Sequence, residues 1–295
     1  METLLLNNEY LSQFKNYMST YRLAHDETFL SLEDIENFRI DQNNHTMISI
    51  KRGEIIGCLS LMLSPYYLKA NKARVRIFHC IEPIQYHYET LLKSIGDLSN
   101  EIEKLELFIP DYLGPVIQIY KSLGFTYYRN AYVMEEKNKS QVYAKFPKGF
   151  ELKPFRFNQD EEAYAEVRNR AFRHLKGSEV PLTPDQVKDQ YQDKSVLKDG
   201  MRILWHHQVH VGVIRMLLDE EGRLISFVAP IAIIPEYQGR GLGLELLNAG
   251  IEIGQNAGLY DCLLSLNSEN EQALKLYKKL DFEVLITVSC YHLKI

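Results

Sequence analysis

The stretch IAIIPEYQGRGLGL, residues 231–244, runs from a continuous apolar segment directly into a glycine-rich one. The apolar residues predict a buried strand, and the glycines after them predict the start of a helix. The first backbone N–H groups of a helix have no partner within the helix, and glycine lets the chain approach a ligand closely. This junction is therefore typical of a site for an anion such as a phosphate, with Arg240 as an added positive charge.

Two common nucleotide-binding motifs do not fit this junction. The dinucleotide pattern G-x-G-x-x-G needs a glycine three positions after Gly241, where the sequence has Leu244. The P-loop needs Gly-Lys followed by Ser or Thr, which this stretch lacks. We therefore expect neither a nicotinamide dinucleotide nor a nucleoside triphosphate here.

An internal repeat indicates how the chain is organised. Residues 119–125, IYKSLGF, are similar to residues 276–282, LYKKLDF, at an offset of 157 positions. Upstream, the alternating hairpin pattern of residues 48–61, with a glycine in it, returns at residues 203–218, at an offset of 155 positions. Two different elements in the same order at nearly one offset predict two copies of one α/β unit.

Proline and glycine near residue 147 mark the expected boundary between the copies. We therefore predict one domain over residues 1–146 and a second over residues 147–295. In the second copy, the hydrophobic periodicity and the turn residues predict the element order βααβββαβαβ. Thr183 followed by Pro184 is expected to begin the second of its helices, with a hydroxyl N-cap and proline at the first helical position.

The composition excludes several classes of function. The chain of 295 residues has 34 Lys and Arg against 39 Asp and Glu, a formal net charge of −5 without a long run of one sign. A nucleic-acid partner is therefore not expected. The longest strongly apolar stretch, residues 224–235, is shorter than the roughly 20 residues that a membrane span needs. The leucines near the N-terminus are followed at once by polar residues, without the basic region of a signal peptide, so we expect a cytoplasmic protein.

The cysteines indicate neither a disulfide framework nor a metal site. They lie far apart in the sequence and form no C-x-x-C pair, which predicts buried free thiols. The four are Cys58, Cys80, Cys262 and Cys290.

The glycine-rich junction resembles the acyl-CoA motif of the GNAT (GCN5-related N-acetyltransferase) superfamily, Q/R-x-x-G-x-G/A. The motif is matched by Gln238-Gly239-Arg240-Gly241-Leu242-Gly243. Residues 267–270 and 273–282 are similar to the segments that follow the motif in that family. The resemblance covers about residues 150–295. It departs from the family at Asp281, where glycine is usual at the end of the last helix and Asp is less well tolerated.

The resemblance implies an α/β fold with a mixed sheet, in two tandem GNAT-like domains, and acetyl-CoA as co-substrate without a metal. The backbone of residues 231–233 would pair with the pantetheine amides, with the N–H of Ile233 directed at the thioester oxygen. Residues 238–243 would hold the pyrophosphate. The residues expected to bind the co-substrate are Ile231, Ala232, Ile233, Gln238, Gly239, Arg240, Gly241, Leu242, Gly243, Asn267 and Asn270.

The resemblance also implies a general acid, whereas the general base stays open. Tyr277 matches the tyrosine that often protonates the departing thiolate in this family; its alternative role is a helix tyrosine that fills the core. An amine must lose a proton before it attacks, and a carboxylate usually assists. Glu236 is a weak candidate for this base, beside Asp261, Glu179 and Asp219. His206 and His207 are interpreted as surface residues at the end of a hairpin.

The first copy lacks the phosphate-binding glycines. At the offset of 157, the motif positions fall on residues 81–86, IEPIQY, which contain no glycine, and Asn267 corresponds to Pro110. Proline removes one N–H donor, bulky side chains fill the space of a phosphate, and Glu82 repels anions. We therefore expect the first domain to be a degenerate GNAT-like copy that binds no CoA.

We expect an acetyl-CoA-dependent N-acetyltransferase that transfers an acetyl group to a primary amine of a small molecule or a peptide by direct attack. One alternative is a sensor that binds CoA and regulates a partner without turnover. Another is transfer of an aminoacyl or other acyl group within the same architecture. A homodimer is left open, and neither a nucleic acid nor a membrane is expected as a partner.

Overall fold

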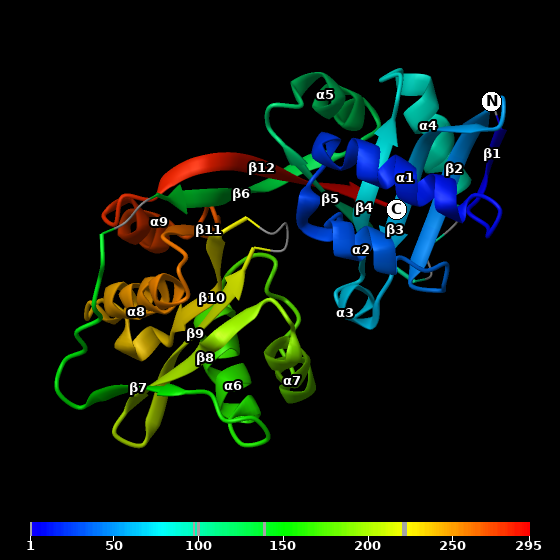
Figure 1. Cartoon of the computed structure of the whole chain (residues 1–295). Helices are drawn as coiled ribbons and strands as arrows, with labels where there is room; N and C mark the ends of the chain where they lie inside the picture. Colours follow the sequence, from blue (N-terminus) through cyan, green and yellow to red (C-terminus); the bar gives the residue numbers. More distant parts are fainter. Residues whose placement is uncertain (1, 97, 99–100, 138–139, 220–222) are drawn as a thin grey trace. The chain divides into compact units, whose positions relative to one another are not determined.

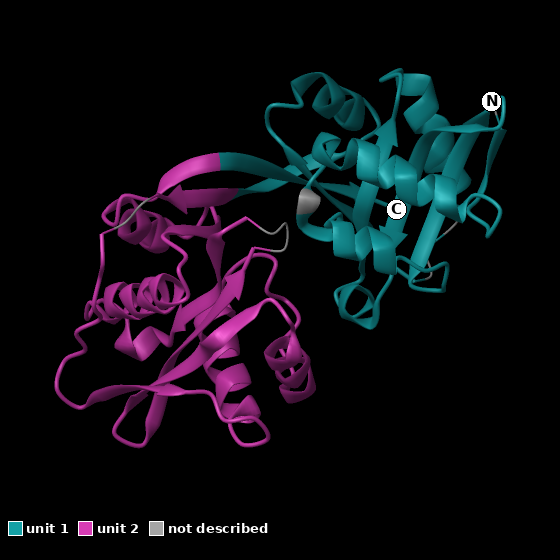
Figure 2. Ribbon diagram, viewed as in Figure 1, with its two compact units in different colours: residues 1–131, 286–295 teal, residues 132–285 magenta. Residues whose placement is uncertain are grey.

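The computed structural model describes residues 2–96, 98, 101–137, 140–219 and 223–295. No helix in these ranges is long and apolar enough to cross a membrane. The chain divides into two compact units (Figure 2). Unit 1 consists of residues 1–131 and 286–295, and unit 2 consists of residues 132–285.

Unit 1 has a mixed sheet in the order β1-β2-β3-β4-β5-β12, in which β4 and β5 are parallel and the other neighbours are antiparallel. Its strands are β1 (Glu2–Leu5), β2 (Asn44–Lys51), β3 (Glu54–Met62), β4 (Lys72–Cys80), β5 (Lys104–Pro110) and the last part of β12 (Glu283–Lys294). Its helices are α1 (Leu11–Tyr21), α2 (Leu32–Asn37), α3 (Pro65–Leu68), α4 (Gln85–Ser94) and α5 (Gly114–Ser122), with short 3₁₀ turns at Arg22–Ala24 and Glu27–Phe29.

The core of unit 1 lies on both faces of this sheet. Phe14 and Met18 of α1 pack with Ile48 of β2 in one apolar cluster. Leu91 of α4 and Ile117 of α5 belong to a second cluster, with residues of β3, β4 and β5. Successive side chains of a strand point to opposite faces, so one sheet supports both helical layers.

Unit 2 has the strand order β11-β10-β9-β8-β7, in which β10 and β11 are parallel. Its strands are β7 (Phe150–Pro154), β8 (Val196–His206), β9 (Val209–Leu218), β10 (Ile225–Ile233) and β11 (Asp261–Asn267). Its helices are α6 (Glu161–Phe172), α7 (Pro184–Gln192), α8 (Leu242–Asn256) and α9 (Glu271–Lys278), with a 3₁₀ turn at Pro235–Tyr237 (Figure 1).

The predicted order βααβββαβαβ is confirmed, from β7 through β12. Unit 1 follows the same succession from β1 to β6 (Thr126–Glu136), with α3 added between β3 and β4. The predicted start of α7 is also confirmed, because the Thr183 hydroxyl caps the helix and Gln186 completes a capping box. Asp281 has a φ of 65°, so it holds the left-handed conformation for which glycine is usual.

The two compact units differ from the predicted halves, residues 1–146 and 147–295. β6 passes from unit 1 into unit 2 at Tyr132, and β12 passes from unit 2 into unit 1 at Ile286. The reason is a long-range pairing, because β12 lies antiparallel to β5, with Val288 opposite Pro110 and Lys294 opposite Lys104. The last strand of the sequence therefore completes the sheet of the first unit.

Gly200 tests the backbone packing of unit 2. It lies where the register of β8 against β9 shifts, and a Cβ there would lie 2.7 Å from the carbonyl oxygens of Leu197 and Met216. Gly200→Ala should lower the free energy of unfolding by roughly 1–3 kcal/mol. Urea unfolding followed by the fluorescence of Trp205, the one tryptophan of the chain, measures this change. Gly114→Ala is the control, because no atom lies within 4 Å of its added Cβ; equal effects of both changes would contradict this packing.

Candidate functional site

A cavity of about 640 Å³ opens in unit 2 along β10, the loop after it and α9. Most of the residues predicted to bind the co-substrate line this cavity: Ile231, Ala232, Ile233, Gln238, Gly239, Gly241, Leu242, Gly243 and Asn270. Tyr277, the predicted acid, lines it as well. Arg240, Asn267 and Glu236 do not belong to the lining.

β10 and β11 are paired only along their first halves. Their parallel register ends at Val228 opposite Leu264, and β10 continues to Ile233 with β9 as its paired neighbour. Ile234 donates its N–H to the carbonyl of Val211 in β9, and successive N–H groups of a strand point to opposite sides. The N–H of Ile233 therefore points to the side of β11, into the gap between the separated strands.

The loop between β10 and α8 presents backbone donors to the same cavity. Gly239 and Gly241 have φ values of 73° and 78°, a conformation that favours glycine. No side chain caps α8 at Gly241, and the first intrahelical bond is donated by Leu244. Among the backbone hydrogen bonds of the described residues, none is donated by residues 239–243, so these N–H groups can meet a ligand. The helix N-terminus adds a partial positive charge. This geometry suits an anion.

Gln238 and Arg240 make contacts within the loop itself. The Gln238 amide donates to the Ile233 carbonyl at 2.8 Å, which fixes the loop against the end of β10. Arg240 donates to the Glu236 carbonyl at 2.9 Å, and its guanidinium lies 4.7 Å from the centre of the Tyr237 ring. The Arg240 side chain thus lies against the loop and outside the cavity lining.

His206 differs from its interpretation as a surface residue. Its Nδ1 lies 3.0 Å from the Tyr237 hydroxyl, and its ring stacks on Phe150 with the ring centres 4.4 Å apart. Tyr237 lines the cavity. His206 therefore connects the end of β8 to the glycine-rich loop, a long-range contact that the local sequence does not reveal.

Tyr277 lies on α9 with 6% of its surface exposed and with its side chain against the cavity. Burial raises the pKa of Tyr277 above its ordinary value, and nearby Cys262 adds to the shift. The hydroxyl therefore stays protonated at neutral pH and can act as a proton donor.

The two asparagines after β11 have different surroundings. Asn267 donates to the Lys176 carbonyl at 3.1 Å and accepts the N–H of Glu269, so its amide is used within the protein. Asn270 caps α9 by accepting the N–H of Ala273, and it also lines the cavity.

The four carboxylates considered as the base lie outside the cavity lining. Glu236 is 61% exposed and accepts a hydrogen bond from Arg170 of α6 at 3.1 Å. Backbone hydrogen bonding and Arg170 lower the pKa of Glu236, which makes it a weaker base. Asp219 is paired with Arg223, Glu179 accepts the N–H of Gly177, and Asp261 begins β11.

Four residues that were not among the predicted site residues also line the cavity: Ala171, Phe172, His174 and Leu175. They come from the C-terminal end of α6 and from the segment that follows it. Their spacing in the sequence is that of an ordinary helix end. It does not reveal that they line a cavity, because this depends on how α6 packs against β10.

Unit 1 repeats the separated strands but closes the gap with its own side chains. β4 and β5 are in register only over the first three residues of β4. Farther along, the Tyr88 hydroxyl accepts the N–H of Cys80 at 3.3 Å, and the Tyr120 hydroxyl donates to the carbonyl of Phe78. Tyr88 and Tyr120 are both fully buried. The N–H of Cys80 and the carbonyl of Phe78 in β4 thus have partners within the protein.

Strand register identifies Cys80 as the counterpart of Ile233. Cys80 lies opposite Gly57 of β3, as Ile233 lies opposite Gly212 of β9, and the two glycines correspond in the sequence repeat. The N–H that points into the gap of unit 2 is therefore bonded to a tyrosine in unit 1.

The helix tyrosine and the loop also differ between the units. Tyr120 corresponds to Tyr277 in the repeat, yet its hydroxyl is bonded to the backbone of β4. The connection between strand and helix consists of residues 234–241 in unit 2 and only of residues 81–84 in unit 1. Unit 1 thus lacks half of the loop that presents the N–H donors in unit 2.

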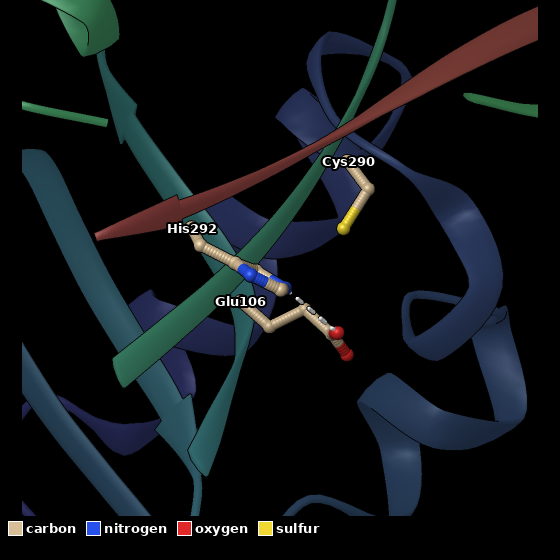
Figure 3. Close-up of side chains that lie close together, drawn as sticks. All are labelled: Glu106, Cys290 and His292. Atoms are coloured by element: carbon tan, nitrogen blue, oxygen red, sulfur yellow. Dashed lines mark hydrogen bonds and ion pairs between the residues drawn. The ribbon is translucent and has the colours of Figure 1, made fainter. Parts of the chain in front are cut away.

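A second cluster of reactive side chains lies in unit 1 (Figure 3). Glu106, Cys290 and His292 come from the paired strands β5 and β12, and their potential ligand atoms lie within 4.8 Å of one another. Lys72, however, places its ammonium 3.1 Å from the Glu106 carboxylate. Burial also raises the pKa of the Cys290 thiol to about 12, so the thiolate that a metal needs is disfavoured.

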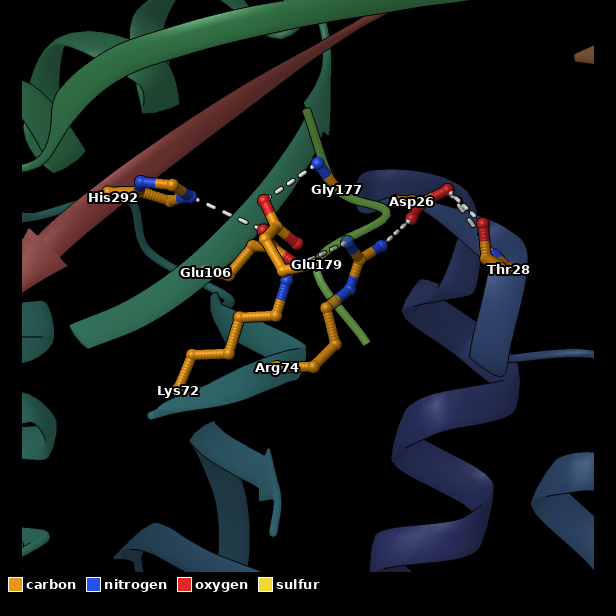
Figure 4. Close-up of polar contacts among 8 residues, drawn as sticks. All are labelled: Asp26, Thr28, Lys72, Arg74, Glu106, Gly177, Glu179 and His292. Carbon is orange, nitrogen blue, oxygen red and sulfur yellow. Dashed lines mark hydrogen bonds and ion pairs between the residues drawn. The ribbon is translucent and has the colours of Figure 1, made fainter. Parts of the chain in front are cut away.

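Positive side chains surround Glu106 (Figure 4). Arg74 lies 3.9 Å from the Glu106 carboxylate and forms an ion pair with Asp26, and His292 donates to Glu106 at 3.3 Å. Burial alone would raise the pKa of Glu106, but His292, Lys72 and Arg74 together lower it to about 2. Because a further cation would have to displace these groups, the cluster fits an ion-pair network and not a metal centre.

Comparison with known proteins finds a family match in the second half of the chain. The model of the acetyltransferase (GNAT) family matches residues 162–282. The segment that carries the cavity is therefore similar to GNAT acetyltransferases.

Particular relatives agree with this assignment. A mycothiol acetyltransferase of Kocuria rhizophila is 30% identical over 148 residues, which are 46% of this chain and 47% of the relative. One of Pseudarthrobacter chlorophenolicus is 32% identical over 148 residues, 47% of this chain and 44% of the relative. The matched part thus spans about half the length of these curated relatives.

Solved structures share the fold along nearly the whole chain. A GCN5-related N-acetyltransferase from Sphaerobacter thermophilus has a TM-score of 0.75 at 16% identity, over 99% of this chain and 95% of the other. A tandem GNAT protein from the clavulanic acid biosynthesis pathway has a TM-score of 0.70 at 13% identity, over 99% and 98%.

The ion-pair network predicts a pH dependence of stability in unit 1. The folded-state pKa of Glu106, about 2, lies below the ordinary value of 4.5. The contribution of Glu106 to the free energy of unfolding is therefore present above pH 4.5 and is lost as the pH falls towards 2. Glu106→Gln should lower the free energy of unfolding by roughly 2–4 kcal/mol at pH 7 and by less at pH 3.

Urea unfolding followed by circular dichroism at both pH values measures this difference. Glu82→Gln, at an exposed carboxylate of the same unit, is the control and should have little effect at either pH. A Glu106→Gln effect of the same size at pH 7 and pH 3 would contradict the role of the carboxylate charge.

Proposed function

We propose that this protein is an acetyl-CoA-dependent N-acetyltransferase whose donor site is the cavity of unit 2. It transfers the acetyl group to a primary amine of a small molecule by direct attack. The observation that carries the proposal is that an unpaired strand edge, a cradle of N–H groups and a protonated tyrosine line one cavity.

The donor is held by backbone groups. Pantetheine is an extended chain with amides, and it adds to the open edge of β10 as a further strand would. Its pyrophosphate binds the N–H groups of the loop around Gly239 and Gly241 and the N-terminus of α8. Asn270, which also lines the cavity, offers the amide nitrogen of its side chain as a further donor.

The same groups assist the chemistry. When the amine attacks, negative charge develops on the thioester oxygen, and the N–H of Ile233 points into the gap where that oxygen would lie. The departing thiolate takes a proton from the hydroxyl of Tyr277. A buried thiolate is more basic than one in water, which favours this transfer from a phenol.

The acceptor is inferred only as a class. The relatives with about 30% identity are named mycothiol acetyltransferases, which supports an acceptor of low molecular weight for this chain too. A primary amine of a peptide is the second candidate acceptor, and it would be acetylated by the same reaction.

Unit 1 is proposed to be a degenerate copy that binds no acetyl-CoA. Tyr88 and Tyr120 occupy the gap that pantetheine would enter, and the shorter connection at residues 81–84 offers fewer N–H groups to a pyrophosphate. One acetyl-CoA per chain is therefore expected. A CoA sensor without turnover would bind the same single molecule, and it is distinguished by the absence of thiol release with every amine tested.

Gly241→Glu tests the position of the donor site. The change places a side chain on a backbone with a φ of 78° and adds a negative charge beside the pyrophosphate. Isothermal titration with acetyl-CoA should show one site in the natural protein and an affinity at least 100-fold lower in the variant, a loss of about 2.7 kcal/mol.

Ile84→Glu is the matched control in the corresponding, exposed connection of unit 1. It should leave the affinity for acetyl-CoA unchanged. The opposite pattern, with Gly241→Glu harmless and Ile84→Glu damaging, would overturn the assignment of the site to unit 2.

Tyr277→Phe tests the proton donor. The variant keeps the ring and loses the hydroxyl, so turnover should fall by roughly 100-fold while the affinity for acetyl-CoA changes little. Thiol release from acetyl-CoA with a panel of primary amines measures turnover. An unaffected rate would make Tyr277 a structural residue of the core.

A further inference from the structure

The cavity of unit 2 lacks the carboxylate that a general base would usually supply. Among the described residues that line it there is no Asp or Glu. The titratable side chains in its lining are Tyr237, Tyr277, Lys275, Lys279 and His174. Histidine is the residue type that exchanges a proton most readily near neutral pH, whereas tyrosine and lysine ordinarily stay protonated there.

His174 lies two residues beyond the end of α6. Phe172 and Leu175 on either side of it line the cavity too, so this wall of the cavity is built from the helix end. The same cavity contains Ile233, whose N–H points into the strand gap, and Tyr277. His174 thus lines the same cavity as Ile233 and Tyr277.

His174 accepts a hydrogen bond from the residue before it. Its Nε2 accepts the Nε–H of Arg173 at 2.9 Å, so this nitrogen presents a lone pair. Both side chains are exposed. An N–H group of the acceptor ammonium can therefore replace the Nε–H of Arg173 as the hydrogen-bond donor to Nε2, with little loss of free energy.

We propose that His174 is the general base of the acetyl transfer, an inference that rests on the function proposed above. Nε2 removes one proton from the acceptor ammonium, and the free amine forms the C–N bond with the thioester carbon. The C–S bond then breaks, and the thiolate takes the proton of the Tyr277 hydroxyl. The second proton of the nitrogen restores this hydroxyl, and His174 releases its own proton to water.

His174→Gln tests this assignment, because glutamine still offers an acceptor to Arg173 but does not remove a proton. With acetyl-CoA and the amine of the panel that is acetylated fastest, kcat/KM at pH 7 should fall about 100-fold. The affinity for acetyl-CoA, from isothermal titration, should not change. His207→Gln is the matched control, since His207 lies at the turn between β8 and β9 and outside the cavity lining.

His174→Gly separates a base from a merely structural residue. Imidazole added to the buffer should raise the rate of His174→Gly at least tenfold, and the gain should follow the concentration of unprotonated imidazole. The rate of His207→Gly should not change. Full activity of His174→Gln, or a loss in His174→Gly that imidazole does not restore, would overturn the inference. Failure to bind acetyl-CoA, or to release thiol with every amine, would instead overturn the proposed function itself.

Discussion

The site depends on one constraint: β10 and β11 pair along their first halves and then separate. Backbone N–H and C=O groups in the interior require hydrogen-bond partners, and beyond Val228 the side of β10 towards β11 has none from that strand. The cavity, the glycine-rich loop and α9 all surround this open edge. An extended ligand with amides would satisfy this requirement, which supports the pantetheine donor proposed above.

Unit 1 meets the same constraint in the opposite way. Tyr88 and Tyr120 bond the backbone groups of β4 from within the protein. Tyr120 is the counterpart of Tyr277, so one residue type at one place in the fold fills a gap in one unit and faces a cavity in the other. The difference comes from the neighbouring backbone, because a short connection brings α4 directly after β4, whereas the longer loop of unit 2 leaves room.

Local patterns in the sequence were sufficient for much of this structure. The apolar run followed by Gly239, Gly241 and Gly243 predicted a strand, a loop and a helix, and the repeat predicted two units with the same element order, because both signals lie within short segments. Three features depend on long-range packing and could not be predicted: the pairing of β12 with β5, the closure of the unit 1 gap by tyrosines, and the position of His174 on the cavity wall. The predicted boundary at residue 147 differs from the compact units for the first of these reasons.

Hydrogen–deuterium exchange with and without acetyl-CoA tests the central claim most directly, because it reports on backbone N–H groups. If pantetheine pairs with the open edge of β10, acetyl-CoA should slow the exchange of peptides that contain residues 231–233 and 239–243. Peptides that contain residues 78–86 of unit 1 should exchange at the same rate in both states, since their gap is already filled. Protection confined to residues 78–86, or no protection at residues 231–233, would contradict the account.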